Sequence, residues 1–409
     1  MLSRDDIIAA LTEGHLKIYP FNKKDLTGIG YNLSTTNFAF SINKGILLTV
    51  HQRTTANGLR RYVVISGNDT VLFFSKEYIA VDNTLAGTFH SKVARVCQGL
   101  GHISTTLDPT WKGQLIISVN NPTSEAIVFE LDKLSGNIFT LLLHKLDTPV
   151  TGQEVHDNNR GRCDLLLEHF SKPSTGKKYK IKHLELQDFI VNEFANSLNG
   201  YDNFLDNHKY QDKYSDKITK IFELKKRLET DNVLINESRY SLGENGTYRI
   251  FRNNEEEQLF TDCAISKIKE KLKHEYEYQD ITNNTLKITN LIGHILYVLD
   301  YELDMMNHIR RIEWQNDKIK HFADEESEFV KERKREDMKS FRRKLWIPIA
   351  LIIAMFAALL FAIIKVDASN KNYSTIIVCI VTVIAPILTL FLERWFKAWK
   401  EQKARAEAE

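Results

Sequence analysis

The sequence predicts a mainly β amino-terminal domain, followed by an α-helical region and a carboxy-terminal transmembrane helical hairpin. Up to about Val150, short apolar runs rich in β-branched and aromatic residues are separated by Gly, Asn, Asp and Pro, which is typical of a barrel or sandwich. No proline lies between Pro173 and Pro348, and this absence favours long helices. Two long uncharged runs then follow, Leu345–Ile364 and Ser374–Leu392.

The amino-terminal domain is expected to comprise residues 1–150 and to open with a short helix, Arg4–Glu13. Residues 151–178 mix Gly, Asn, Asp and charged side chains, so they are predicted to form a linker. The expected strands of the domain are Phe38–Ile42, Ile46–Val50, Tyr62–Ile65, Val71–Phe74, Leu115–Val119, Ala126–Leu131 and Ile138–Leu143.

Residues 179–344 are predicted to form a helical stalk or bundle, with coiled-coil character. One helical face of this region carries an apolar stripe, which is typical of a bundle core or an oligomer seam rather than a ligand site. Its members are Ile288, Leu291, Ile292, Ile295, Leu299, Leu303 and Met306.

The two uncharged runs are each long enough to cross the roughly 30 Å hydrocarbon core of a bilayer as a helix. Basic residues gather outside them, with an excess in Lys331–Lys344 and in the tail 393–409. Because basic flanks stay on the cytoplasmic side, both termini are expected to be cytoplasmic. The prediction is a two-span protein of the inner or plasma membrane, with the lipid bilayer as a partner; the alternative is a helical hairpin buried in a large core.

Charge and motifs exclude several classes of function. The chain has 55 Lys+Arg against 53 Asp+Glu, and this near-balance argues against a basic surface for nucleic acid, so no nucleic-acid partner is expected. The sequence contains no GxxxxGK[ST] phosphate loop, no HExxH and no GxSxG elbow. The zinc-deaminase pattern of HxE followed by PCxxC is also missing.

Four segments of the first 145 residues carry motifs in a defined order. They are LSRDDIIAALTEGHLKIYPF at Leu2–Phe21, YNL at Tyr31–Leu33, HSKVAR at His90–Arg95 and LDPTWKG at Leu107–Gly113. In this order they resemble the dCTP deaminase branch of the trimeric dUTPase superfamily. Members of that branch have a similar helix-and-strand opening, a YDLR-like strand, a GRSSLAR loop and an IDPGW hairpin.

The resemblance implies a dUTPase-like distorted β-barrel or jelly roll that assembles as a homotrimer, or a multiple of it, with nucleotide sites between subunits. It places Ser91, Lys92 and Arg95 on the family's loop, near the nucleotide. Asp108 falls on the hairpin aspartate that orients the hydrolytic water in dUTPases, and Thr106 lies beside it. Asp108 is therefore the only catalytic candidate, and Mg²⁺ is the only cofactor expected, if a nucleoside triphosphate is bound.

These residues also have structural interpretations. A hydroxyl, a guanidinium and a carboxylate together can hold a polar anionic ligand. However, Asp108-Pro109 is also a common start of a turn, and Arg95 could form a salt bridge between subunits.

Departures from the family pattern argue against deamination. The family's deaminases use a glutamate ten residues after the hairpin aspartate as a general base, and that position is Ser118. A serine hydroxyl does not take up a proton at neutral pH, so deamination is expected to be lost. His90 replaces the first arginine of the loop, Lys92 its second serine, and Thr105 a glycine before the hairpin. Hydrolysis at phosphate is less excluded, because Asp108 remains.

Three functions are compatible with this sequence. The leading hypothesis is a nucleotide-sensing membrane effector with a catalytically degraded sensor, in bacterial antiphage defence by architectural analogy. The first alternative is a membrane-anchored dCTP deaminase or dUTP pyrophosphatase with a remodelled site. The second is a non-catalytic trimeric scaffold.

Overall fold

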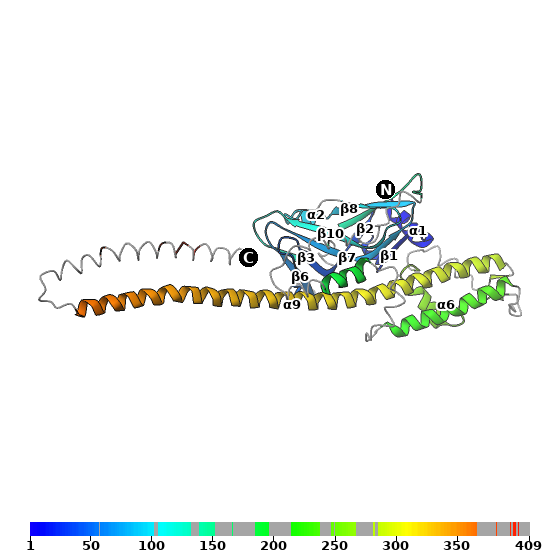
Figure 1. Cartoon of the computed structure of the whole chain (residues 1–409). Helices are drawn as coiled ribbons and strands as arrows, with labels where there is room; N and C mark the ends of the chain where they lie inside the picture. Colours follow the sequence, from blue (N-terminus) through cyan, green and yellow to red (C-terminus); the bar gives the residue numbers. More distant parts are fainter. Residues whose placement is uncertain are drawn as a thin grey trace. The chain divides into compact units, whose positions relative to one another are not determined.

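A computed structural model of the 409-residue chain shows a β-rich amino-terminal part followed by helices (Figure 1). The chain divides into two compact units, Met1–Glu328 and Phe329–Glu409. The structure describes residues 1–56, 58–101, 105–131, 139–151, 185–195, 214–237, 247–248, 250–266, 281–282 and 285–365, together with positions 166, 382, 393, 396, 397 and 400.

The amino-terminal part contains two short helices, one 3-10 turn and twelve described strands. The helical elements are α1 (Arg4–Glu13), η1 (Lys23–Asp25) and α2 (Val93–Val96). The strands are β1 (Leu16–Tyr19), β2 (Tyr31–Leu33), β3 (Thr35–Ser41), β4 (Ile46–Leu47), β5 (His51–Thr55), β6 (Gly58–Ile65), β7 (Asp69–Val81), β8 (Leu85–Ser91), β9 (Thr106–Leu107), β10 (Lys112–Asn121), β11 (Ile127–Glu130) and β12 (Phe139–Lys145).

These strands form three antiparallel sheets, so the predicted mainly β amino-terminal domain is confirmed. The largest sheet has the order β1-β7-β3-β4, and β10 also pairs with β7. A second sheet has the order β2-β12-β8-β9, and a third the order β11-β6-β5. The helix expected at Arg4–Glu13 is α1, which Ser3 and Asp6 cap reciprocally through side chain and backbone.

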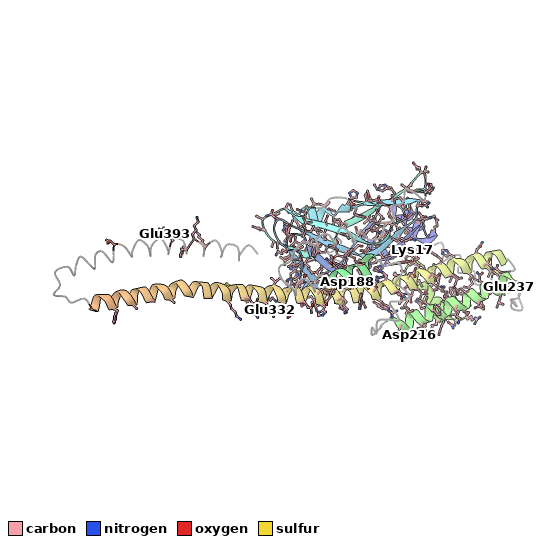
Figure 2. All side chains as sticks on the ribbon, viewed as in Figure 1. Lys17, Asp188, Asp216, Glu237, Glu332 and Glu393 are labelled. Carbon is pink, nitrogen blue, oxygen red and sulfur yellow. The ribbon has the colours of Figure 1, made fainter. Side chains whose placement is uncertain are left out.

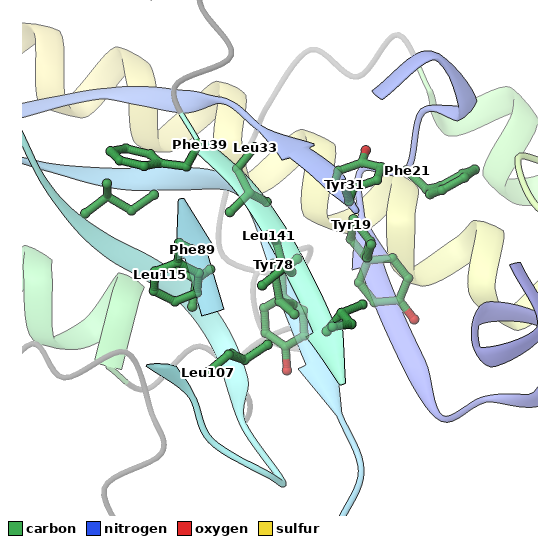
Figure 3. Packing of buried hydrophobic residues seen from close by; sticks show 14 of the residues in the cluster. Tyr19, Phe21, Tyr31, Leu33, Tyr78, Phe89, Leu107, Leu115, Phe139 and Leu141 are labelled. Atoms are coloured by element: carbon green, nitrogen blue, oxygen red, sulfur yellow. The ribbon is translucent and has the colours of Figure 1, made fainter. Parts of the chain in front are cut away.

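Apolar side chains from all three sheets meet in one core. Strand residues alternate between the two faces of a sheet, and β12 shows this alternation, with Phe139, Leu141 and Leu143 buried. Figure 3 shows part of this core, where Leu33, Phe89 and Leu115 lie around β12. Burial of these side chains holds the sheets together.

Gly30 lies where β12 passes so closely that no side chain fits. A Cβ at this position would lie 2.6 Å from the carbonyl oxygen of Leu141 and 2.9 Å from side-chain carbons of Thr140 and Leu142. We expect Gly30→Ala to lower the free energy of unfolding by roughly 1–2 kcal/mol, because the backbone must shift to relieve this overlap. Chemical denaturation measures the change, and Gly28→Ala is the matched control, since a Cβ there meets nothing within 4 Å. Equal stability of the two variants would contradict the argument.

The helical elements after the β-domain are η2 (Val191–Ala195), α6 (Ser215–Asn236), α7 (Asn254–Thr261) and α9 (Thr285–Lys365), with a short pair of strands, β13 (Thr247–Tyr248) and β14 (Ile281–Thr282). The predicted apolar stripe lies on α9. It packs within the chain, since Ile288, Ile292 and Leu299 share a buried cluster with residues of α6 and α7.

Polar side chains of α9 bond to the backbone of the β-domain, along which the helix runs in Figure 1. The Tyr301 hydroxyl accepts from the Ile18 backbone N–H (3.2 Å) and donates to the Ile18 carbonyl (2.6 Å). Further along, His308 Nε2 donates to the Lys76 carbonyl, and Asn316 Oδ1 accepts from the Asn37 N–H. Glu326 accepts from the Leu47 N–H at 2.6 Å. The helix thus satisfies backbone groups that the sheet leaves unpaired.

The predicted transmembrane hairpin and the two-span membrane localisation are wrong. Across the described residues, the structure contains no helix that combines the length and the apolar character needed to cross a bilayer. The run Leu345–Ile364 is not a separate helix with its own ends. It continues α9, an 81-residue helix that also carries the charged stretch Lys331–Lys344, so reading the run in isolation misled the prediction. The second run, Ser374–Leu392, lies outside the described residues except for Thr382.

Candidate functional site

The first group of predicted site residues lies where β8 ends and α2 begins. Ser91 is the last residue of β8 and Lys92 precedes the helix, and both are partly exposed. Burial lowers the pKa of Lys92. The exposed His90 lies 3.0 Å from the Thr88 hydroxyl through its Nε2 atom. Ser91 and Lys92 are therefore accessible to a ligand.

Arg95 has a different environment, because it is only 5% exposed. Its guanidinium donates to the Gln98 side chain (3.1 Å) and to the Glu130 carbonyl (3.2 Å), and it lies 4.6 Å from the centre of the Phe129 ring. Burial lowers the pKa of this group, and Glu130 acts in the opposite direction. These contacts fasten α2 to β11, so within one chain Arg95 has a structural role.

The second group lies on the hairpin between β9 and β10. Thr106 and Asp108 are exposed. Thr110 has a φ of +63°, a left-handed conformation that is unfavourable for a β-branched residue, and its N–H donates to the Asp82 carbonyl. The indole of Trp111 is buried and donates to the Gly113 carbonyl. The contacts of Thr110 and Trp111 thus hold the turn on its buried side, while Asp108 is exposed to solvent.

One chain does not bring the two groups together. Leu107 of β9 pairs with Gly87 of β8, and Ser91 lies four residues further along β8. At about 3.3 Å per residue, this places the Ser91 end roughly 13 Å from the hairpin. A ligand that contacts both Ser91 and Asp108 of one chain has to bridge most of this span; otherwise it contacts the two residues in different copies of the chain.

Ser118 lies on β10 opposite Leu72 of β7 and is partly exposed. A hydroxyl of ordinary acidity cannot act as a general base at this position. In the described part of the chain, no group of three or more His, Cys, Asp or Glu side chains is arranged to hold a metal ion.

The sequence analysis missed a buried carboxylate. Glu77 is 2% exposed, and it accepts from the Ser34 backbone N–H (2.9 Å) and the Ser34 hydroxyl (2.6 Å). Ser34 separates β2 from β3, which belong to different sheets, and Glu77 satisfies its N–H at this transition. Burial raises the pKa of Glu77 to about 6, although the bonds from Ser34 lower it. The only sequence signal was a block of three polar residues, Ser75–Glu77, between the apolar segments Val71–Phe74 and Tyr78–Val81.

These features define an antiparallel β-domain with two separated sets of accessible polar residues, one on a strand–helix junction and one on a hairpin. A family model described as dCTP deaminase-like matches residues 1–134. The amino-terminal domain is therefore dCTP deaminase-like, as its motifs predicted. No curated protein matches the chain.

Solved structures with similarity include 2'-deoxycytidine 5'-triphosphate deaminase from Agrobacterium tumefaciens, with 9% identity, 36% of this chain covered and a TM-score of 0.27. The match spans only 48% of that deaminase. A mutant dUTPase of Staphylococcus bacteriophage 80alpha shares 13% identity, with 35% of this chain and 97% of the dUTPase covered and a TM-score of 0.23. The native EIAV dUTPase shares 14% identity over 35% of this chain and 98% of its own, with a TM-score of 0.21.

Proposed function

We propose that the dCTP deaminase-like domain binds a nucleotide but no longer deaminates it, and that it works as a nucleotide sensor. The observation that carries this proposal is Ser118, which falls on the position of the family's catalytic glutamate by the motif resemblance. Accessible polar groups for a ligand remain, because Ser91 and Lys92 are partly exposed and Thr106 and Asp108 are exposed. Binding without deamination is the function that this combination supports best.

We infer that the nucleotide lies between two copies of the chain, as part of a homotrimer or a multiple of it. The distance of roughly 13 Å along β8 supports this arrangement, because one copy would supply Ser91 and Lys92 and another would supply Thr106 and Asp108. The surface next to the loop also supports it, since Val93 is 78% exposed and Val96 is 56% exposed. Apolar side chains of this kind are favourable at a subunit interface.

A second candidate is hydrolysis of a nucleoside triphosphate at phosphate, as in a dUTP pyrophosphatase. It is supported by the exposed Asp108 carboxylate, which could orient a water molecule, and it requires Mg²⁺ on the phosphates. The membrane part of the effector hypothesis is not retained, because it depended on the transmembrane hairpin. The role in antiphage defence is not retained either, because its analogy of architecture rested on the same hairpin.

The proposal predicts that the full chain binds dCTP or dUTP saturably in the presence of Mg²⁺ without converting dCTP to dUTP. Asp108→Asn and Ser91→Ala should each weaken binding about tenfold, because a hydrogen bond to a charged group contributes about 1.5–3 kcal/mol. Isothermal titration calorimetry measures affinity, and chromatography of the nucleotides detects deamination and hydrolysis.

Asp5→Asn is the matched control, because this aspartate is exposed and lies on α1 of the same domain. It should bind as the unmodified chain does. Release of dUTP from dCTP would refute the loss of deamination, and release of dUMP from dUTP would favour the second candidate. Absence of saturable binding would favour the non-catalytic scaffold.

A further inference from the structure

A pocket of about 830 Å³ opens between the large sheet of the β-domain and α9. It is lined by residues of β1, β7 and β10, by Asp304 of α9, and by neighbouring loop residues such as His15 and Val150. Its volume is in the range of small-molecule sites. Asp304 and Val150 lie outside the residues that match the dCTP deaminase-like family, 1–134. The pocket contains none of Ser91, Lys92, Arg95, Thr106 or Asp108.

The strand register places two lysines in one row across this pocket. Lys17 of β1 and Lys112 of β10 both pair with Ala80 of β7, from opposite sides. Directly opposed residues point to the same face of a sheet, and all three line the pocket. Two strand spacings separate the lysine backbones by about 10 Å, and the small Ala80 side chain leaves the space between them open. Figure 2 labels Lys17 on the side of the domain along which α9 runs.

Neither lysine forms a close ion pair in the described part of the chain, although Lys17 acts on Asp304 by charge at longer range and opposes the rise in its pKa. Among the described residues, no carboxylate lies within ion-pair distance of Lys17 or Lys112. Asp82, also in the pocket wall, is already engaged by the Thr84 N–H and hydroxyl and by His15. Two flexible ammonium groups that line one pocket can together bind a divalent anion. Lysine is a common phosphate ligand, which it binds as a point charge.

Asp304 gives the opposite wall a hydrogen-bond acceptor. Its Oδ2 accepts from the Tyr19 hydroxyl at 3.1 Å, and Tyr19 and Tyr78 stack beneath it with ring centroids 6.0 Å apart. Both rings are labelled in Figure 3. Burial raises the pKa of Asp304, and the nearby Lys17 acts in the opposite direction. The other carboxylate oxygen, Oδ1, can accept a hydrogen bond from a donor group of a ligand.

We propose that this pocket is a second binding site, which takes a small phosphorylated molecule with its phosphate between Lys17 and Lys112 and a hydrogen-bond donor group facing Asp304. The ligand contacts both the β-domain and α9. Its binding therefore strengthens the attachment of the helix to the sheet by mass action.

Titration of the full chain with inorganic pyrophosphate tests the proposal. Saturable binding is expected, and the double variant Lys17→Gln/Lys112→Gln should bind at least tenfold more weakly. Ala80→Leu keeps every charge but fills the space between the lysines, so it should also lose binding. The control Lys44→Gln/Lys145→Gln removes two exposed lysines of the same domain and should bind normally.

Asp108→Asn and Ser91→Ala separate this site from the proposed nucleotide site, because neither residue lines the pocket. Pyrophosphate binding should survive in both variants. An unmodified chain that shows no saturable binding would overturn the proposal, and so would a Lys17→Gln/Lys112→Gln variant with unchanged affinity. If Ala80→Leu does not fold, the charge variants still decide the question.

Discussion

Replacing Tyr301 with phenylalanine is expected to lower the free energy of unfolding by about 2–4 kcal/mol. The tyrosine is 2% exposed, and its hydroxyl bonds to both the N–H and the carbonyl of Ile18. Phenylalanine fills nearly the same volume but leaves both backbone groups buried and unsatisfied. Each such group costs about 1–3 kcal/mol. Chemical denaturation of the full chain, followed by circular dichroism, measures the effect.

The Tyr301 prediction has a matched control in Tyr62→Phe. Tyr62 is partly exposed on β6, and no hydrogen bond of its hydroxyl is found among the described residues. This variant should change stability by less than about 0.5 kcal/mol. If Tyr301→Phe is equally mild, this hydroxyl does not hold β1 to α9, and the contact depends on apolar packing and on other hydrogen bonds such as that from Tyr19 to Asp304.

Glu77→Gln is expected to remove a pH dependence of stability worth about 2 kcal/mol. Burial raises the pKa of Glu77 from 4.5 to about 6 in the folded chain. The folded state therefore holds the proton more tightly than the unfolded state does. The stability from this group is fully present below pH 4.5 and is lost as the pH rises through 6, and 1.5 pKa units correspond to about 2 kcal/mol.

Denaturation of both proteins at pH 4 and at pH 7.5 tests this prediction. Between these values the unmodified chain should lose about 2 kcal/mol more than Glu77→Gln, because the glutamine stays neutral and can still accept from Ser34. Glu125→Gln is the control, since Glu125 is exposed, and it should follow the unmodified chain. A Glu77→Gln variant with the same pH profile as the unmodified chain would show that the carboxylate is not destabilised by burial.

Local patterns predicted most of the β-domain but not its full strands. Arg4–Glu13 is a helix as expected, and every expected strand overlaps an observed one. Val71–Phe74, however, is part of a strand that continues to Val81. Ser75 and Glu77 interrupt the apolar run, and their polar groups are satisfied by distant partners rather than by solvent. A local pattern cannot reveal such partners, because they come from elsewhere in the chain.

The candidate site shows the same limit. The order of the motifs identified Ser91 and Asp108 as candidates but said nothing about the distance between them. That distance follows from the strand register, in which Gly87 pairs with Leu107. Arg95 was expected near a ligand, whereas Phe129 and Glu130, more than thirty residues later, enclose it within the chain. The pocket lined by Lys17, Lys112 and Asp304 was not predicted from the sequence. Asp304 lies 287 residues after Lys17, and the two residues line one pocket only because α9 packs against the sheet.

The attachment of α9 also protects one side of the large sheet from pairing with other chains. β1 and β4 are outer strands on the side of β7 opposite to β10, and open edges of this kind can template aggregation. Tyr301 occupies the backbone groups of Ile18 on one edge strand, and Glu326 occupies the N–H of Leu47 on the other. One helix thus occupies backbone groups of both outer strands on this side of the sheet, through residues 25 positions apart, while β10 forms the other edge. A proteolytic cut that releases α9 would therefore expose the backbone groups of Ile18 and Leu47 to pairing with strands of other chains. By covering these groups, the helix limits aggregation of the β-domain.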